Sequence, residues 1–200
     1  MALRLCHINS RCTISHIIAM TTRLANIEFF NDPYGEVMVS DSEGVRTYRE
    51  EDRALTDAMF TRIEDEYPEA FQALTAIYRK SAPNAPYFKY RVVHRFIRCN
   101  FSVYDRKVDV DGEGRFMLEE VQCPLRCECL YAGVICDAKF NTRLTQRQEE
   151  VMRLYCDGLD ALEIAERLHL SPETVKTTRR NAFRKAGVHN INDFRNITKL

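Results

Sequence analysis

The feature that most constrains this chain is an ordered series of helix start and stop signals between residues 145 and 190. Start signals are side chains that accept the free N–H groups of a first helical turn, and stop signals are glycines that take a left-handed conformation. The series predicts four helices, with only His169 and Leu170 between the second and the third. In order, the signals are Thr145, Gly158, the pair Asp160 and Glu163, Ser171 with Pro172, Gly187 and Asn190. A short helix, a tight turn and a second helix form a helix-turn-helix, whose second helix can enter the DNA major groove.

The predicted helix that opens at Ser171 carries the candidate DNA-binding side chains. Lys176 and Arg180 are four residues apart, so they project together and can donate to guanine or to phosphate. Hydroxyl groups near the start of the helix suit phosphate contacts. The alternative is a solvated basic face with no DNA partner. The full candidate set is Ser171, Thr174, Lys176, Thr177, Arg179, Arg180 and Arg184.

A longer pattern of fixed positions runs through the same segment. It consists of Leu144-Thr-x-Arg-x-x-Glu150-Val151, Gly158-Leu159, Glu163-Ile164-Ala165-x-x-Leu168, Ser171-x-x-Thr174-Val175-Lys176 and Lys185-x-Gly187-Val188. The pattern resembles the LuxR/FixJ-type helix-turn-helix. The resemblance implies a four-helix DNA-binding domain at residues 143–200, with base contacts from Lys176, Thr177 and Arg180. It also implies a homodimer, because the fourth helix of such domains often supports dimerisation.

The distribution of charge agrees with a basic C-terminal domain. The chain has no net charge, but residues 143–200 hold eleven lysines and arginines against eight acids, while the rest holds eighteen against twenty-one. This polarity is compatible with a nucleic-acid partner for the C-terminal domain. No apolar run is long enough for a membrane span or a signal peptide, so we expect a cytoplasmic protein without membrane contact. Residues 1–20 are expected to be a disordered extension, with Met20 as an alternative initiator.

Residues 21–140 predict a separate α+β domain, which makes the whole chain mainly α. A turn at residues 31–35 precedes a short strand at residues 36–39. Four-residue spacing of Leu55, Met59, Ile63 and Tyr67 predicts a buried helix face, and residues 68–78 predict a second helix. The pattern of residues 87–101 fits either a helix or a strand, and the apolar residues on one side favour a helix. Segments 107–110 and 116–121 flank the turn sequence at residues 111–114, which predicts a β-hairpin.

Eight cysteines are present, and four of them lie between residues 123 and 136. Without a secretion signal, such a cluster favours metal binding over disulfides. We expect Cys99, Cys123, Cys129 and Cys136 to hold a structural zinc ion, with Cys127 as the alternative to Cys129. An iron–sulfur cluster and metal-free reduced thiols are the competing interpretations.

The sequence does not predict an enzyme, since it has neither a glycine-rich phosphate loop nor a nucleophile elbow. The leading hypothesis is a DNA-binding transcriptional regulator whose first domain is a metal-stabilised interaction or sensing module. One alternative is an interaction adaptor, such as a sigma-factor-like partner of RNA polymerase. Another is a redox or metal sensor that uses the cysteine cluster as its switch.

Overall fold

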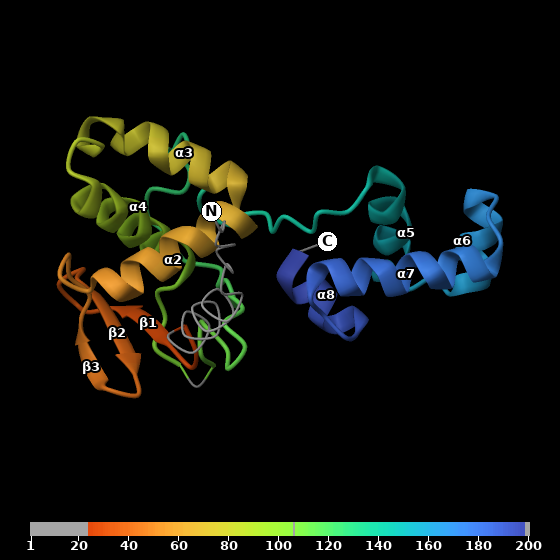
Figure 1. The fold of residues 1–200 in the computed structure, drawn as a ribbon, viewed down its shortest axis with the longest axis horizontal. Helices are drawn as coiled ribbons and strands as arrows, with labels where there is room; N and C mark the ends of the chain where they lie inside the picture. The colour runs from red at the N-terminus through yellow and green to blue at the C-terminus, as the bar shows by residue number, and fades with distance from the viewer. Residues whose placement is uncertain (1–23, 106, 199–200) are drawn as a thin grey trace, which may run out of the picture.

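The computed structural model describes residues 24–105 and 107–198, which form two groups of elements joined by an extended segment (Figure 1). The first group combines a small antiparallel sheet with helices, and the second consists of helices. This confirms the predicted fold class. The expected disordered extension at residues 1–20 lies outside the described residues. No described helix is both long and apolar enough to span a lipid bilayer.

The sheet is a meander of three short antiparallel strands in the order β1-β2-β3. The register places Phe29 opposite Val39 and Met38 opposite Thr47. The turn before β2 forms as expected, because Asp32 Oδ1 accepts the backbone N–H groups of Tyr34 and Glu36, both at 2.8 Å. The predicted strand at residues 36–39 is confirmed as β2, whereas β1 and β3 were not predicted. The strands are β1 (Glu28–Asn31), β2 (Val37–Asp41) and β3 (Gly44–Thr47).

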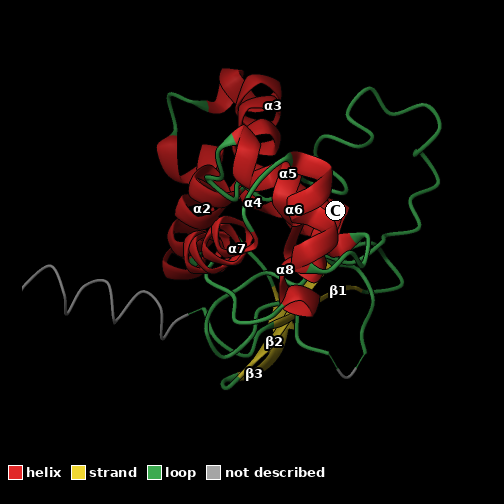
Figure 2. Ribbon diagram, turned by 90° about the vertical axis from the view of Figure 1, so that its right-hand side faces the viewer, coloured by secondary structure: helices red, strands yellow, loops and turns green. Residues whose placement is uncertain are grey.

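Three helices lie on one side of this sheet, as both views show (Figures 1 and 2). Of these, α4 contacts β1 and β2 and also packs against the other two helices. The predicted buried stripe of α2 is confirmed, because Met59 and Ile63 have no exposed surface. The elements are α2 (Arg53–Glu66), α3 (Pro68–Tyr78), a 3-10 turn (Arg79–Ser81) and α4 (Ala85–Asn100).

Aromatic rings fill the centre of this first core. Phe96 on α4 contacts the rings of Tyr67, Phe101 and Phe116, with centroids 5.4–6.1 Å apart. Each is buried, so the cluster joins the helices to the chain that follows α4. Burying such a side chain stabilises the folded state by about 1.5–3 kcal/mol.

The predicted hairpin at residues 107–121 is shorter than expected. Its turn forms, but the only ladder contact across it is the bridge between Val110 and Phe116. Val110 also bridges to Ile27, and the Asp109 carboxyl group accepts the N–H of Phe29 at 2.6 Å through Oδ2. This segment is therefore held by the chain around β1 rather than by a second strand of its own.

The second group contains four helices around a separate hydrophobic core. Its helices are α5 (Gln146–Cys156), α6 (Ala161–Leu168), α7 (Pro172–Ala186) and α8 (Ile191–Thr198). α7 packs against both α5 and α6, and α5 also contacts α8. Phe140, just before the second group, packs against both cores.

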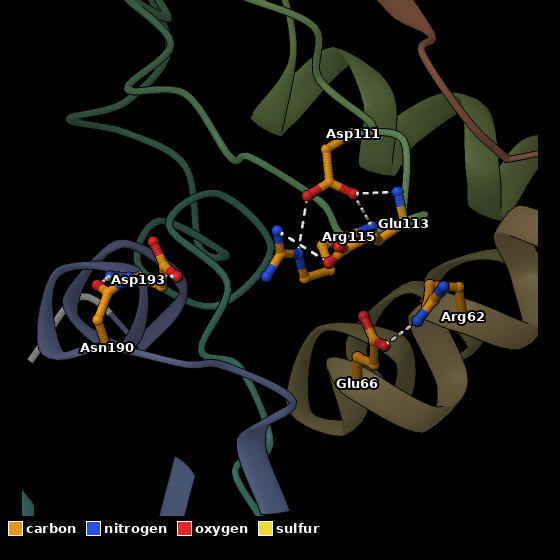
Figure 3. A network of polar contacts seen from close by, with 7 residues as sticks. All are labelled: Arg62, Glu66, Asp111, Glu113, Arg115, Asn190 and Asp193. Carbon is orange, nitrogen blue, oxygen red and sulfur yellow. Dashed lines mark hydrogen bonds and ion pairs between the residues drawn. The ribbon is translucent and has the colours of Figure 1, made fainter. Parts of the chain in front are cut away.

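Charged side chains lie where the two groups meet (Figure 3). Arg115 donates to Asp111 at 2.7 Å, and the nearby charge of Asp193 on α8 also favours the charged form of Arg115. On α2, Arg62 is paired with Glu66. Side chains from both groups line a cavity of about 520 Å³ at this boundary.

Candidate nucleic-acid interface

The start of α5 is fixed by a capping box that also holds the end of α7. Thr145 accepts the N–H of Gln148, and the Gln148 side chain accepts the N–H of Thr145. Lys185 adds a tether between the helices, because its Nζ donates to Gln148 Oε1 at 2.8 Å and to the Arg143 carbonyl at 3.1 Å. Lys185 is therefore engaged within the domain, although it lies on the basic helix.

The connection between α6 and α7 is a tight turn with defined ends. Asp160 opens α6 by accepting the N–H groups of Leu162 and Glu163 at 2.8 and 2.9 Å. His169 closes it in a left-handed conformation, with φ of +53°. The guanidinium of Arg147 on α5 donates to the Leu168 carbonyl at 2.7 Å, which satisfies one free acceptor of the helix end. These contacts set the angle at which α7 leaves α6.

α7 buries one face and leaves the other open. Val175 and Ala182 are fully buried against α5 and α6, and Ala186 is 6% exposed. The chain turns off the helix at Gly187, where φ is +68°. All seven predicted DNA-binding residues lie on the exposed surface: Ser171, Thr174, Lys176, Thr177, Arg179, Arg180 and Arg184.

The structure gives these exposed cations different surroundings. Lys176 pairs with Glu173 at 2.9 Å, and Arg184 donates to Asn181 at 3.2 Å. The guanidinium of Arg179 lies 5.0 Å from the centre of the Tyr155 ring on α5, so this side chain packs across the helix pair. Arg180 belongs to no ion pair within the described residues. Arg180 is thus the most available cation of the helix.

The Lys176 ion pair is weak enough to be exchanged for an external anion. An exposed pair is worth about 0.2–1 kcal/mol, whereas a good bidentate contact to a base discriminates by about 1–3 kcal/mol. Lys176, Arg180 and Arg184 share the lining of a shallow groove with Phe183 and His189. The groove offers several donors to an anion at once.

The N-terminal turn of α7 offers one free hydroxyl hydrogen. Ser171 Oγ accepts the N–H of Thr174 at 3.1 Å and also lies 2.8 Å from Thr174 Oγ1. One hydroxyl of the pair donates to the other, so the second hydroxyl retains a hydrogen for an external acceptor. The positive end of the helix dipole makes an anionic acceptor favourable at this place.

Residues 142–195 match the model of the family described as bacterial regulatory proteins, luxR family. The C-terminal domain belongs to the LuxR family. The match includes α5, α6, α7 and the start of α8, and it confirms the resemblance seen in the sequence. It supports DNA binding and transcription regulation as the role of the domain. No solved structure matches the chain.

The described cysteines outside the LuxR-family domain lie at the end of α4 and in the segment that follows it. All described cysteines are free thiols. Cys99 is half-buried in the last turn of α4, and this burial raises the pKa of its thiol. Cys127 is exposed. Within the described part of the chain, no group of three or more cysteine, histidine or acidic side chains is arranged to hold a metal ion.

Three side chains make contacts in the LuxR-family domain that sequence reasoning did not predict. Arg147 and Lys185 donate to backbone carbonyls of other segments, and Tyr155 supports Arg179. A basic residue in a helix carries no sequence signal for a carbonyl far along the chain.

Proposed function

We propose that this chain is a transcriptional regulator that binds a specific double-stranded DNA sequence by placing α7 in the major groove. The observation that carries the proposal is the two-sided character of α7. Val175 and Ala182 bury one face, while Lys176, Thr177 and Arg180 are exposed on the other. The major groove is wide enough to accept a helix with this kind of surface.

Different parts of α7 contact different parts of the DNA. Arg180 suits bidentate donation to guanine O6 and N7, and Thr177 can offer a hydroxyl or a methyl group to a neighbouring base edge. The hydroxyl pair Ser171 and Thr174 meets a phosphate and fixes the depth of the helix. Lys176 leaves Glu173 and contacts a phosphate or a guanine.

A second copy of the chain is the expected partner on DNA. One recognition helix reads only a few base pairs, which is too little information to select a site among the competitors in a genome. Two copies related by a two-fold axis read half-sites about 34 Å apart, one turn of the duplex. We propose this homodimer as the DNA-binding species.

The N-terminal region, residues 24–140, supplies the interaction or sensing part of the regulator. It has its own hydrophobic core, and the LuxR-family match does not extend into it. It lies next to α8, and Arg115 interacts there with the charge of Asp193. Through this contact, a change in the N-terminal region can alter the orientation of the DNA-binding domain.

The test is selection of a binding sequence from random duplexes with the full chain, followed by affinity measurements over a range of salt concentrations. We expect affinity to fall steeply with salt, with each phosphate contact adding about 0.9 to the logarithmic slope. Arg180→Ala is expected to weaken binding by about 1–3 kcal/mol and to relax the preference at one base pair. Glu173→Gln is expected to strengthen binding, because it frees Lys176 and removes a negative charge near phosphate.

Lys89→Ala is the matched control, since it removes one exposed cation from α4, far along the chain from α7. Its affinity for the selected duplex should equal that of the unmodified chain. Equal losses for Lys89→Ala and Arg180→Ala would mean that only net charge matters. Failure to enrich any duplex, or binding that does not respond to salt, would rule out the proposal.

A further inference from the structure

The cavity of about 520 Å³ at the boundary between the two groups has the properties of a ligand site. The chain before β1 and helix α2 line it from one group, and the ends of α7 and α8 line it from the other. Ligand pockets usually have about 300–1,000 Å³, are mostly apolar and occur preferentially between domains. The apolar part of this lining consists of Leu24, Ala58, Phe116, Phe140 and Ile197.

Basic side chains outnumber acidic ones in the same lining. The acids are Asp65 and Glu66, both near the end of α2. The bases are Arg62, Arg115, Arg143, Arg184 and Lys185. An excess of positive charge around a cavity with apolar walls raises the local concentration of anions. The charge of the lining therefore favours a negatively charged ligand.

Three of these five bases are engaged within the protein. Arg62 is paired with Glu66, and Arg115 is paired with Asp111 at 2.7 Å (Figure 3). Lys185 is the tether to the start of α5 described above. These contacts fix the walls of the cavity, and they leave Arg143 and Arg184 as the cations best placed to bind a ligand.

Arg143 and Arg184 are exposed and belong to no ion pair within the described residues. Arg184 donates to the neutral amide oxygen of Asn181 at 3.2 Å. The backbone of Arg143 is held on both sides, because Asn141 Oδ1 accepts its N–H at 3.2 Å and Lys185 Nζ donates to its carbonyl at 3.1 Å. Its φ of +52° is uncommon for a residue with a side chain. Arg143 is therefore fixed at the cavity, between the two groups.

A carboxylate is the anion that this arrangement fits best. A guanidinium donates two parallel hydrogen bonds to the oxygens of a carboxylate, in a geometry that matches both groups. A phosphate has the same kind of oxygens but carries up to two negative charges. The carboxylates of Asp65 and Glu66 in the lining repel a doubly charged group more strongly than a singly charged one.

We propose that this cavity binds a small organic carboxylate with an apolar body, and that the bound ligand weakens DNA binding. Arg143 and Arg184 hold the carboxylate, and the apolar body packs against Phe116, Phe140 and Ile197. The ligand contacts both groups of elements at once, so it binds to one particular arrangement of the two.

The effect on DNA follows from Arg184, and this part of the inference rests on the proposed function. Arg184 and Gly187 line the cavity and also the groove that contains Lys176 and Arg180. A carboxylate bound to Arg184 removes one donor from the DNA-binding surface and adds a negative charge near the phosphates. By linkage, DNA must weaken ligand binding by the same factor.

The first experiment uses naphthoate as the probe on the full chain, because the fluorescence of its ring changes when the ring is buried. Naphthamide has the same apolar body without the charge, and naphthyl phosphate has a different anionic group. We expect one naphthoate per chain and binding of the other two compounds that is roughly 10-fold weaker or more, since hydrogen bonds between charged groups are the strong ones.

Substitutions then locate the site. Arg143→Gln should weaken naphthoate binding roughly 10-fold or more and leave naphthamide binding unchanged. Thr61→Phe places a ring in the cavity from an exposed position on α2 and should weaken both compounds. Arg53→Gln is the matched control, because Arg53 is also exposed on α2 but does not line the cavity. Thermal unfolding followed by circular dichroism checks that each variant is folded.

The second experiment measures the affinity for the selected duplex with and without saturating naphthoate. We expect a loss of about 5-fold or more, the lower end of typical coupling between two sites. The same comparison with Arg143→Gln, at the same naphthoate concentration, should show a smaller loss. The duplex should in turn weaken naphthoate binding to the unmodified chain.

Each of the other outcomes overturns a defined part of the inference. A chain that binds none of the three compounds has no such site, and equal loss of naphthoate in Arg143→Gln and Arg53→Gln would place the ligand elsewhere. Tighter binding of naphthyl phosphate would refute the carboxylate, and unchanged DNA affinity would refute the coupling. Fluorescence measures the site without DNA, so its failure and the failure of the proposed function are distinguishable.

Discussion

Some basic residues of α7 contact the rest of the domain, whereas others are free to bind a partner. Lys185 donates to two groups around the start of α5, and Arg179 packs over Tyr155. Arg180 is exposed and outside the described ion pairs. The sequence placed all of them on one basic helix but could not separate these roles. The separation depends on which neighbours lie within reach of each side chain, and those neighbours come from distant positions in the chain.

Asp109 gives a prediction about pH. Burial, with the charges of Glu28 and Glu119 nearby, raises the pKa of Asp109 to about 9, although its hydrogen bond from Phe29 N–H acts in the opposite direction. The folded state therefore holds a proton that the unfolded state releases near the ordinary pKa of 3.8. We expect the free energy of unfolding to decrease as pH rises between about 4 and 9.

Asp109→Asn tests this expectation, because the amide can still accept from Phe29 N–H but cannot ionise. Urea unfolding followed by circular dichroism at several pH values should show a weaker dependence on pH for this variant. Glu64→Gln, at an exposed position on α2, is the control and should keep the pH dependence of the unmodified chain. An unchanged slope for Asp109→Asn would contradict the pKa assignment.

At the scale of elements, helix ends were predictable where a side chain signals them locally. Thr145, Asp160 and Ser171 each cap the helix that they were expected to open. The signal and its effect lie within four residues, so no tertiary information is needed. Strands β1 and β3 were missed because they are only four residues long, and β3 has no buried residue to produce an alternating pattern.

The cap of α6 provides a prediction about stability. Asp160→Ala removes the acceptor for the Leu162 and Glu163 N–H groups and should lower the free energy of unfolding of the C-terminal domain by about 1 kcal/mol. Asp157→Ala is a suitable control because Asp157 is also exposed but follows α5. Its effect should stay within about 0.5 kcal/mol. Chemical denaturation of both variants checks the difference, and equal effects would show that the cap is not the cause.

The approximate site could be predicted, while the supporting contacts could not. Spacing and caps identified α7 and its basic face from neighbouring residues alone. The contact from Arg147 to the Leu168 carbonyl joins positions on two helices, and the hydrogen bond that Phe29 N–H donates to Asp109 joins parts of the chain 80 residues apart. Sequence patterns of short range contain no record of such pairs. For the same reason, the hairpin at residues 107–121 was predicted longer than it is.

At the scale of the whole molecule, the two hydrophobic cores predict two units of unfolding. Phe96 is fully buried in the first core and Phe194 in the second. Phe96→Ala should destabilise the N-terminal region by about 3–5 kcal/mol, while amide exchange in α7 stays slow. Phe194→Ala should produce the reverse pattern. Hydrogen exchange read by mass spectrometry measures both, and loss of protection throughout the chain in either variant would indicate a single cooperative unit.

Phe140 packs against both cores, just ahead of the first residue of α5. While the Phe140 ring stays packed, the two groups therefore have little freedom to move relative to each other. In a pair of chains bound to one operator, the distance between the two N-terminal regions would then be fixed. Such a pair should accept only a narrow range of spacer lengths between its half-sites, and a release of Phe140 would widen that range.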